Sequence, residues 1–226
     1  MRVIFNESLK AVADDLDRMA CNVRDAIRGA GKALLDQDID AAQAVIDHDA
    51  EVDALSTSIV DKCVELLARQ NPVATDLRVI VSTMRLSITF ERMGDLARHI
   101  AEAARRTYPE SPLPADAVDT FRRMQQFLEM TADRLVQMLA DRDTHVADQI
   151  IRDDDQLDEL HLKTMRMAQS EDFVGTNQQL IDVVLIGRFM ERLGDHAVSA
   201  ARRVVFIVSG FDPSKEPARD EGTDID

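Results

Sequence analysis

The sequence predicts an all-helical protein made of two copies of one helical unit. Apolar residues recur at spacings of three and four over long stretches, as on one face of a helix. The 226 residues include only 8 Gly and 6 Pro, which leaves few turns between long elements. A seven-residue motif also returns 100 positions later with five of its seven residues identical. We therefore expect two tandem, pseudo-symmetric three-helix bundles, with six long helices in all.

The first half is expected to form three antiparallel helices. Two amphipathic stripes follow one another, and Asn71-Pro72 ends the second because proline cannot continue a helix. Thr75 or Asp76 is expected to cap the third helix. The expected ranges are 5–34, 39–69 and 75–107.

A proline-rich stretch, residues 108–114, separates the halves and is expected to be the domain boundary. The second half repeats the three-helix rhythm, with expected helices over 115–140, 144–169 and 176–208. The tail is polar, charged and proline-bearing, which predicts disorder. The predicted units are therefore 1–108, 115–209 and, for the disordered acidic tail, 210–226.

The composition argues against several classes of protein. A formal net charge of −15 and a pI near 4.7 disfavour a nucleic-acid surface, which needs Lys and Arg. The longest apolar run, 204–208, is far shorter than the ~20 residues that cross a bilayer. The N-terminal segment lacks the features of a signal peptide, so a cytoplasmic protein is expected. Cys21 and Cys63 are too few for a disulfide framework and are expected to be buried thiols.

Paired carboxylates four residues apart share one face of a helix, but such pairs are common in so acidic a chain. An acidic pair that recurs at the equivalent positions of the second copy is a better candidate for a site than a pair that does not. When the two copies are aligned, most acidic pairs are lost in one of them. Two sets keep both carboxylates in both copies: Asp49/Asp53 with Asp154/Asp158, and Glu91/Asp95 with Glu191/Asp195.

Between antiparallel helices, the two sets can face each other and present four carboxylates in each half. Hard oxygen ligands suit iron, manganese, magnesium or calcium, and zinc less well because neither Cys nor a recurrent His joins them. Alternatively, the pairs bind Arg92, Arg192 or other basic residues and only hold the bundle together. Gly94 and Gly194 lie in the middle of helices, where glycine costs ~1 kcal/mol relative to alanine. They indicate a close approach by a neighbouring helix or by a metal.

Catalytic motifs are not recognisable in the sequence, and we expect no enzyme activity. The enzyme alternative is a carboxylate-bridged di-metal oxidase, which uses Glu-x-x-His from two helices. This chain has only Asp158-x-x-His161, and the first copy has Ser56 at the histidine position. The histidines are expected on the surface, although His99 and His196 can join a site.

The motif Glu-Arg-(Met/Leu)-Gly-Asp in both halves, with Pro-Val-Ala-Thr-Asp-Leu-Arg at 72–78, resembles the PhoU family. The resemblance covers residues 5–208 and implies multinuclear metal clusters, iron among the candidates. Beyond the motif the chain departs from the family pattern, with Leu96 and His99 in the first half and Ser199 for Asn in the second. The implied ligands are Asp49, Asp53, Glu91 and Asp95 in one cluster and Asp154, Asp158, Glu191 and Asp195 in the other.

The resemblance also implies a role. It indicates an accessory regulator of phosphate uptake that represses phosphate-starvation genes, an adaptor between the ATPase subunit of the phosphate ABC transporter and a sensor histidine kinase. The expected partners are therefore these two proteins and a second copy of the chain in a homodimer, without nucleic acid or membrane insertion. The rival interpretation is a purely structural metal-storage or scaffold bundle.

Overall fold

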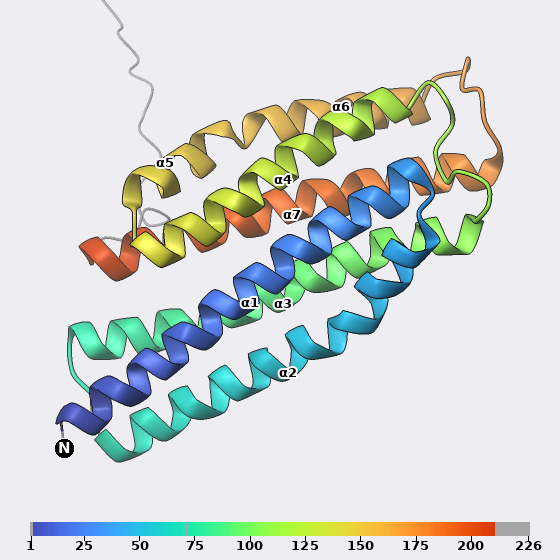
Figure 1. Ribbon diagram of the computed structural model, residues 1–226. Helices are drawn as coiled ribbons and strands as arrows, with labels where there is room; N and C mark the ends of the chain where they lie inside the picture. Colours follow the sequence, from blue (N-terminus) through green and yellow to red (C-terminus); the bar gives the residue numbers. More distant parts are fainter. Residues whose placement is uncertain (1, 71, 211–226) are drawn as a thin grey trace, which may run out of the picture.

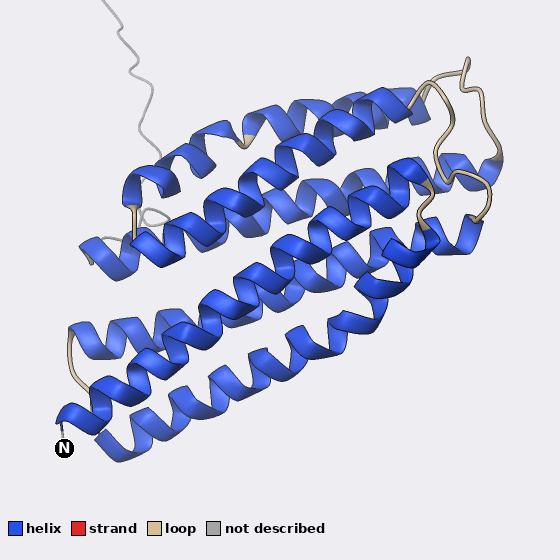
Figure 2. Ribbon diagram, viewed as in Figure 1, coloured by secondary structure: helices blue, strands red, loops and turns tan. Residues whose placement is uncertain are grey.

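The computed structural model describes residues 2–70 and 72–210, and every regular element within them is a helix (Figures 1 and 2). Figure 1 shows two groups of long helices lying side by side, α1–α3 in one and α4–α7 in the other. The predicted all-α fold of two three-helix bundles is confirmed. The helices are α1 (Arg2–Asp36), α2 (Ile39–Gln70), α3 (Thr75–Thr107), α4 (Val118–Asp141), α5 (Thr144–Asp153), α6 (Asp155–Ala168) and α7 (Asn177–Ser209).

The fifth predicted helix is not continuous, which corrects the prediction of one element over 144–169. The chain breaks at Asp154, and α5 and α6 together take the place of one helix. The carbonyl of Asp154 accepts hydrogen bonds from the backbone N–H of Leu157 at 2.8 Å and of Asp158 at 3.2 Å, so the turn tightens there. Three consecutive aspartates, 153–155, supply poor helix propensity and like charges at this point.

The helix starts follow the predictions unevenly. Thr176 caps α7 through a reciprocal pair of hydrogen bonds with Gln179, as its sequence favours. The expected cap of α3 by Thr75 or Asp76 is wrong, because the N-cap residue is Ala74, with φ of 49° and without a side-chain cap. The start of α4 at Val118 is three residues later than expected, since 115–117 form a turn.

The two halves pack on each other through α3 against α7 and α1 against α4. α3 and α7 run antiparallel, since His99 stacks near Phe189 while Arg78, at the other end of α3, lies over Phe206. The division into 1–108 and 115–209 stays a prediction. The tail predicted to be disordered lies, apart from Gly210, outside the described residues.

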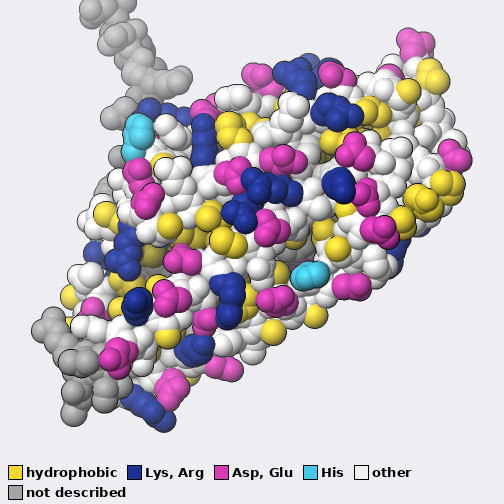
Figure 3. Space-filling view, viewed as in Figure 1, with side chains coloured by type: hydrophobic (Ala, Val, Ile, Leu, Met, Phe, Trp, Pro, Cys, Tyr) yellow, Lys and Arg dark blue, Asp and Glu magenta, His cyan; other side chains and the backbone are white. Residues whose placement is uncertain are grey.

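The apolar stripes of the seven helices form one continuous core, in which Phe90 and Phe121 are fully buried. Cys63 is buried as expected, but Cys21 is only half-buried. In the described part of the chain, no helix has an apolar run long enough to cross a membrane. Figure 3 shows acidic and basic side chains interspersed over one face of the molecule, as expected for a solvated surface.

Candidate metal sites

The structure brings the four carboxylates of the first half together where α2 crosses α3. Gly94 lies at the crossing, and a Cβ there would be 3.2 Å from Val52 Cγ1 and 3.6 Å from Asp49 Oδ1. Burial raises the pKa of Glu91, and the negative charges of the other three carboxylates add to that effect while Arg92 opposes it. We call this group the first cluster: Asp49, Asp53, Glu91 and Asp95.

Arg98 binds the first cluster from within α3, and the sequence argument missed it. Its two terminal nitrogens donate hydrogen bonds to Asp95 Oδ1 and Glu102 Oε1, both at 2.9 Å, and its Nε forms an ion pair with Asp49 Oδ2 at 2.6 Å without hydrogen-bond geometry. The hydrogen bond to Asp95, with the charges of the other two carboxylates, raises the pKa of Arg98. The guanidinium therefore stays charged and bridges α2 to α3.

The second half repeats the arrangement where the α5–α6 break meets α7. A Cβ on Gly194 would be 2.5 Å from Leu157 Cδ2 and 2.8 Å from Asp154 Oδ1, closer than at Gly94. A side chain at position 194 would have to displace the ends of these two side chains, which agrees with the packing explanation offered by the sequence. We call this group the second cluster: Asp154, Asp158, Glu191 and Asp195.

The second cluster lacks a counterpart of Arg98, because the equivalent position holds the buried Val198. Burial, followed by the charges of neighbouring carboxylates, raises the pKa of Asp154 to about 6. Arg188 pairs with Glu191, but Glu191 Oε2 is buried without a hydrogen-bond partner among the described residues. Negative charge is therefore left uncompensated at this cluster.

His161 lies beside the second cluster and was not singled out as a ligand by the sequence. Its Nε2 is buried and has no hydrogen-bond partner in the described part of the chain. Burial and the nearby Arg188 lower the pKa of His161, whereas Asp158 and Asp195 oppose that shift. The neutral ring is the form in which imidazole binds metals. The Asp158-x-x-His161 spacing was the signal in the sequence.

Of the two histidines expected to be able to join a site, His99 pairs with a carboxylate outside the first cluster, and His196 is partly buried beside Asp195. His99 Nδ1 lies 3.1 Å from Glu102 Oε2, and burial together with Arg192 lowers the pKa of His196. Within the described ranges, no group of three or more His, Cys, Asp or Glu side chains is arranged to hold a metal ion. Carboxylates without a cation repel one another, so separated side chains are expected in each cluster.

Comparison with known proteins identifies the fold family. The sequence model of the PhoU domain matches the chain twice, over residues 16–104 and 121–204, so each match contains one cluster motif. The chain belongs to the PhoU family. Both PhoU-domain matches begin within the first helix of their half and end within the last.

The relatives of this PhoU-family chain match over nearly their whole length. A phosphate-specific transport system accessory protein, PhoU homolog 1, from Mycobacterium tuberculosis is 35% identical over 96% of this chain and 98% of the relative. PhoU homolog 2 from the same organism is 34% identical over 94% of this chain and all of the relative. The crystal structure of PhoU from Pseudomonas aeruginosa has 28% identity and a TM-score of 0.85, covering 92% of this chain and all of that one.

The residues of the second cluster fit the hard cation that PhoU-family resemblance implies. Glu191 Oε2 is buried and without a hydrogen-bond partner among the described residues, and so is His161 Nε2, which has a lone pair for a metal when the ring proton is on Nδ1. In the first cluster, Arg98 already pairs with two of the four carboxylates, and Arg92 lies 3.4 Å from Glu91 and 3.3 Å from Asp95. The alternative that arginines hold the bundle together therefore describes the first cluster better than the second.

We expect the stability of the metal-free PhoU-family chain to depend on pH through Asp154. A carboxyl whose pKa is raised on folding stabilises the fold below its ordinary pKa, and this contribution is lost as the pH rises through about 6. Asp154→Asn removes this titrating group. The free energy of unfolding of the variant minus that of the wild type should therefore increase by about 1–2 kcal/mol from pH 4 to pH 7.5, allowing for solvent screening. Urea unfolding in chelator at both pH values measures it. A pH-independent difference would contradict the raised pKa.

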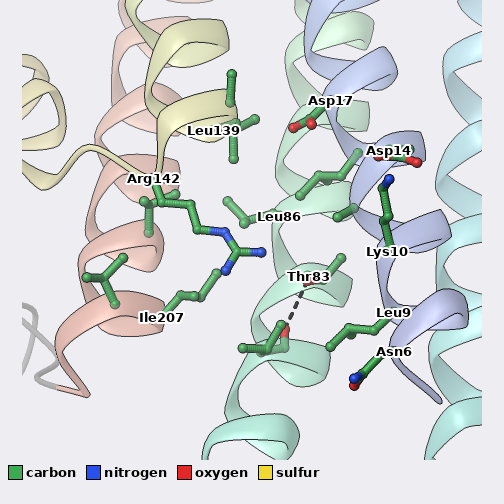
Figure 4. Close-up of a pocket in the computed structure, with 16 residues that line it drawn as sticks. Asn6, Leu9, Lys10, Asp14, Asp17, Thr83, Leu86, Leu139, Arg142 and Ile207 are labelled. Carbon is green, nitrogen blue, oxygen red and sulfur yellow. Dashed lines mark hydrogen bonds between the residues drawn. The ribbon is translucent and has the colours of Figure 1, made fainter. Parts of the chain in front are cut away.

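A cavity of about 400 Å³ lies apart from both clusters, at one end of the interface between the halves (Figure 4). Leu86 of α3, Leu139 of α4 and Ile207 of α7 form part of its wall, and Arg142 extends into it from the end of α4. A second hollow of about 540 Å³ lies between α1 and α2 and reaches Asp49 and Gly94. The first cluster is therefore open to solvent from the α1 side.

Proposed function

We propose that this chain is a non-enzymatic regulator of phosphate uptake that acts in the cytoplasm and represses the phosphate-starvation response. In this role it is an adaptor between the ATPase subunit of the phosphate ABC transporter and a sensor histidine kinase. The observation that carries the proposal is the pair of PhoU-domain matches, supported by relatives named as phosphate-specific transport system accessory proteins that match almost end to end.

We further propose that a hard cation, such as iron, manganese, magnesium or calcium, binds the carboxylate clusters and stiffens the crossing of the helices there. The cation would draw together side chains that now repel one another, with zinc the poorer fit for an oxygen-rich set. The proposed ligands are the eight carboxylates of the two clusters. Support comes from the position of both clusters at glycine crossings, where helix spacing and carboxylate spacing are set together.

The long helices also give an adaptor exposed surface on which to bind partners. Several large aliphatic side chains on α3 and α7 are exposed rather than buried in the core: Leu77, Val81, Ile88, Ile181, Leu185 and Val208. Apolar surface of this kind is what a protein partner can bury on binding. The expectation of a homodimer stays a prediction, which sedimentation velocity would test.

The test is a pull-down of the full chain with the purified ATPase subunit and with the kinase cytoplasmic domain. We expect both partners to bind. In a strain lacking its own PhoU-family protein, we expect the chain to restore repression of a starvation reporter in high phosphate only. Asp154→Asn/Asp158→Asn should weaken repression, while Asp47→Asn/Glu51→Gln, an acidic pair absent from the second copy, should not.

Two results would favour the rival interpretations. Metal binding without contact to either partner and without reporter repression would indicate a structural metal-binding bundle. Oxygen consumption by the iron-loaded chain would indicate a di-metal oxidase. The structure gives the oxidase little support, because the carboxylate and histidine of Asp158-x-x-His161 have no matching pair in the first half.

A further inference from the structure

The two clusters differ most in the cation that the fold itself supplies. Arg98 places its guanidinium within 2.9 Å of Asp49, Asp95 and Glu102, using nitrogens on all three sides of the fork. Two of these carboxylates belong to the first cluster, one from α2 and one from α3. The first cluster therefore already contains a positive charge at the level where its helices cross.

Within the part of the chain that the structure describes, the second cluster has an arginine on only one of its four carboxylates, where Arg188 pairs with Glu191 of the same helix. Position 198, which corresponds to Arg98, is valine with 7% of its surface exposed. Position 202, which corresponds to Glu102, is arginine. In the described residues, no Lys or Arg forms an ion pair with Asp154, Asp158 or Asp195, and Arg188 pairs only with Glu191. The repeat thus keeps the carboxylates in both halves, but only in the first half of the described chain does an arginine contact cluster carboxylates of both helices.

We propose that Arg98 is an internal cation that closes the first cluster, so that the chain binds metal at the second cluster while Arg98 stays in place. The inference rests on the metal binding proposed above. A metal entering the first cluster has to displace the guanidinium from Asp49 and Asp95 or accept its repulsion. The hydrogen bond to Asp95 is charge-assisted and the ion pair with Asp49 adds to it, so the first cluster should bind a divalent cation about tenfold or more weakly than the second. Arg98 cannot remove the repulsion between its charge and the metal by losing a proton, because the guanidinium stays protonated in proteins.

The experiment titrates Mn²⁺ into the chelator-treated full chain by calorimetry and measures bound manganese by mass spectrometry after dialysis. Asp154→Asn/Asp158→Asn should remove the tight Mn²⁺ binding and leave only binding about tenfold or more weaker, whereas Asp49→Asn/Asp53→Asn should remove the weak binding and keep the tight binding. Adding Arg98→Val to the Asp154→Asn/Asp158→Asn chain should restore Mn²⁺ binding, now at the first cluster. Circular dichroism confirms that each variant stays helical.

Arg28→Val is the matched control, because it removes the same charge from an ion pair with Asp133 that contains no cluster residue. It should not restore binding. The role of Arg98 is overturned if Asp49→Asn/Asp53→Asn removes as much manganese as Asp154→Asn/Asp158→Asn. It is also overturned if Arg98→Val restores no binding. In both cases metal binding by the wild type still stands. If neither wild type nor the Arg98→Val chain binds Mn²⁺, the proposed metal function falls with it.

Discussion

Arg106→Met is expected to lower the free energy of unfolding by about 3 kcal/mol, because it leaves a buried carboxylate without its cation. Asp182 near the start of α7 is 1% exposed and forms an ion pair with Arg106 near the end of α3. Gln178 Nε2, which donates to Asp182 Oδ2 at 3.1 Å, would be its remaining partner. Urea unfolding of the full chain measures the loss.

Two variants make this prediction specific. Arg105→Met removes the neighbouring charge, which donates a hydrogen bond to Gln43 at the surface, and should change stability by less than about 0.5 kcal/mol. Arg106→Met/Asp182→Asn should recover a large part of the loss, since the buried charge is gone. If Arg106→Met is no less stable than Arg105→Met, the Asp182 carboxylate does not depend on this ion pair.

Gly194→Ala is expected to destabilise the fold by about 1–2 kcal/mol, whereas Gly94→Ala should be close to neutral. The new Cβ at Gly194 would lie 2.5 Å from the buried Leu157 and 2.8 Å from Asp154, which forces both side chains to move. At Gly94 the nearest atom, Val52 Cγ1, would be 3.2 Å away, and the gain of ~1 kcal/mol in helix propensity offsets a small shift.

Thermal unfolding of both variants in chelator tests the difference, with Gly94→Ala as the matched control. The displaced Asp154 should also weaken Mn²⁺ binding by the Gly194→Ala chain, if the second cluster is the metal site. Equal destabilisation by the two substitutions would contradict the closer approach of helices in the second half.

The helices themselves followed from local features of the sequence. These features act within a few positions of the chain, so their effects can be predicted without knowledge of the fold. They are the spacing of three and four along each stripe, the prolines between 108 and 114, and the capping residue Thr176. The break at Asp154 was missed because the apolar stripe continues across it, although three consecutive aspartates were a visible warning.

The pairing of carboxylates across helices was also predictable, because an internal repeat supplies a second copy for comparison. Asp49 meets Gly94 and Asp154 meets Gly194, as the two registers of 105 and 100 residues require. The same alignment places Arg98 opposite Val198, a difference in charge that the recurrence of acidic residues does not reveal. A comparison of all charges in the two copies would have identified the arginine.

The sequence by itself determined the all-helical fold, the buried faces of the helices and the carboxylates that each half keeps. The tertiary structure decided which charges meet. Arg98 reaches an aspartate 49 positions earlier in the chain and Arg106 reaches one 76 positions later, and both contacts depend on the angle and level at which two helices cross. Periodicity fixes the face of a helix on which a residue lies, whereas ion pairing depends on distances of a few ångströms between helices that only packing sets.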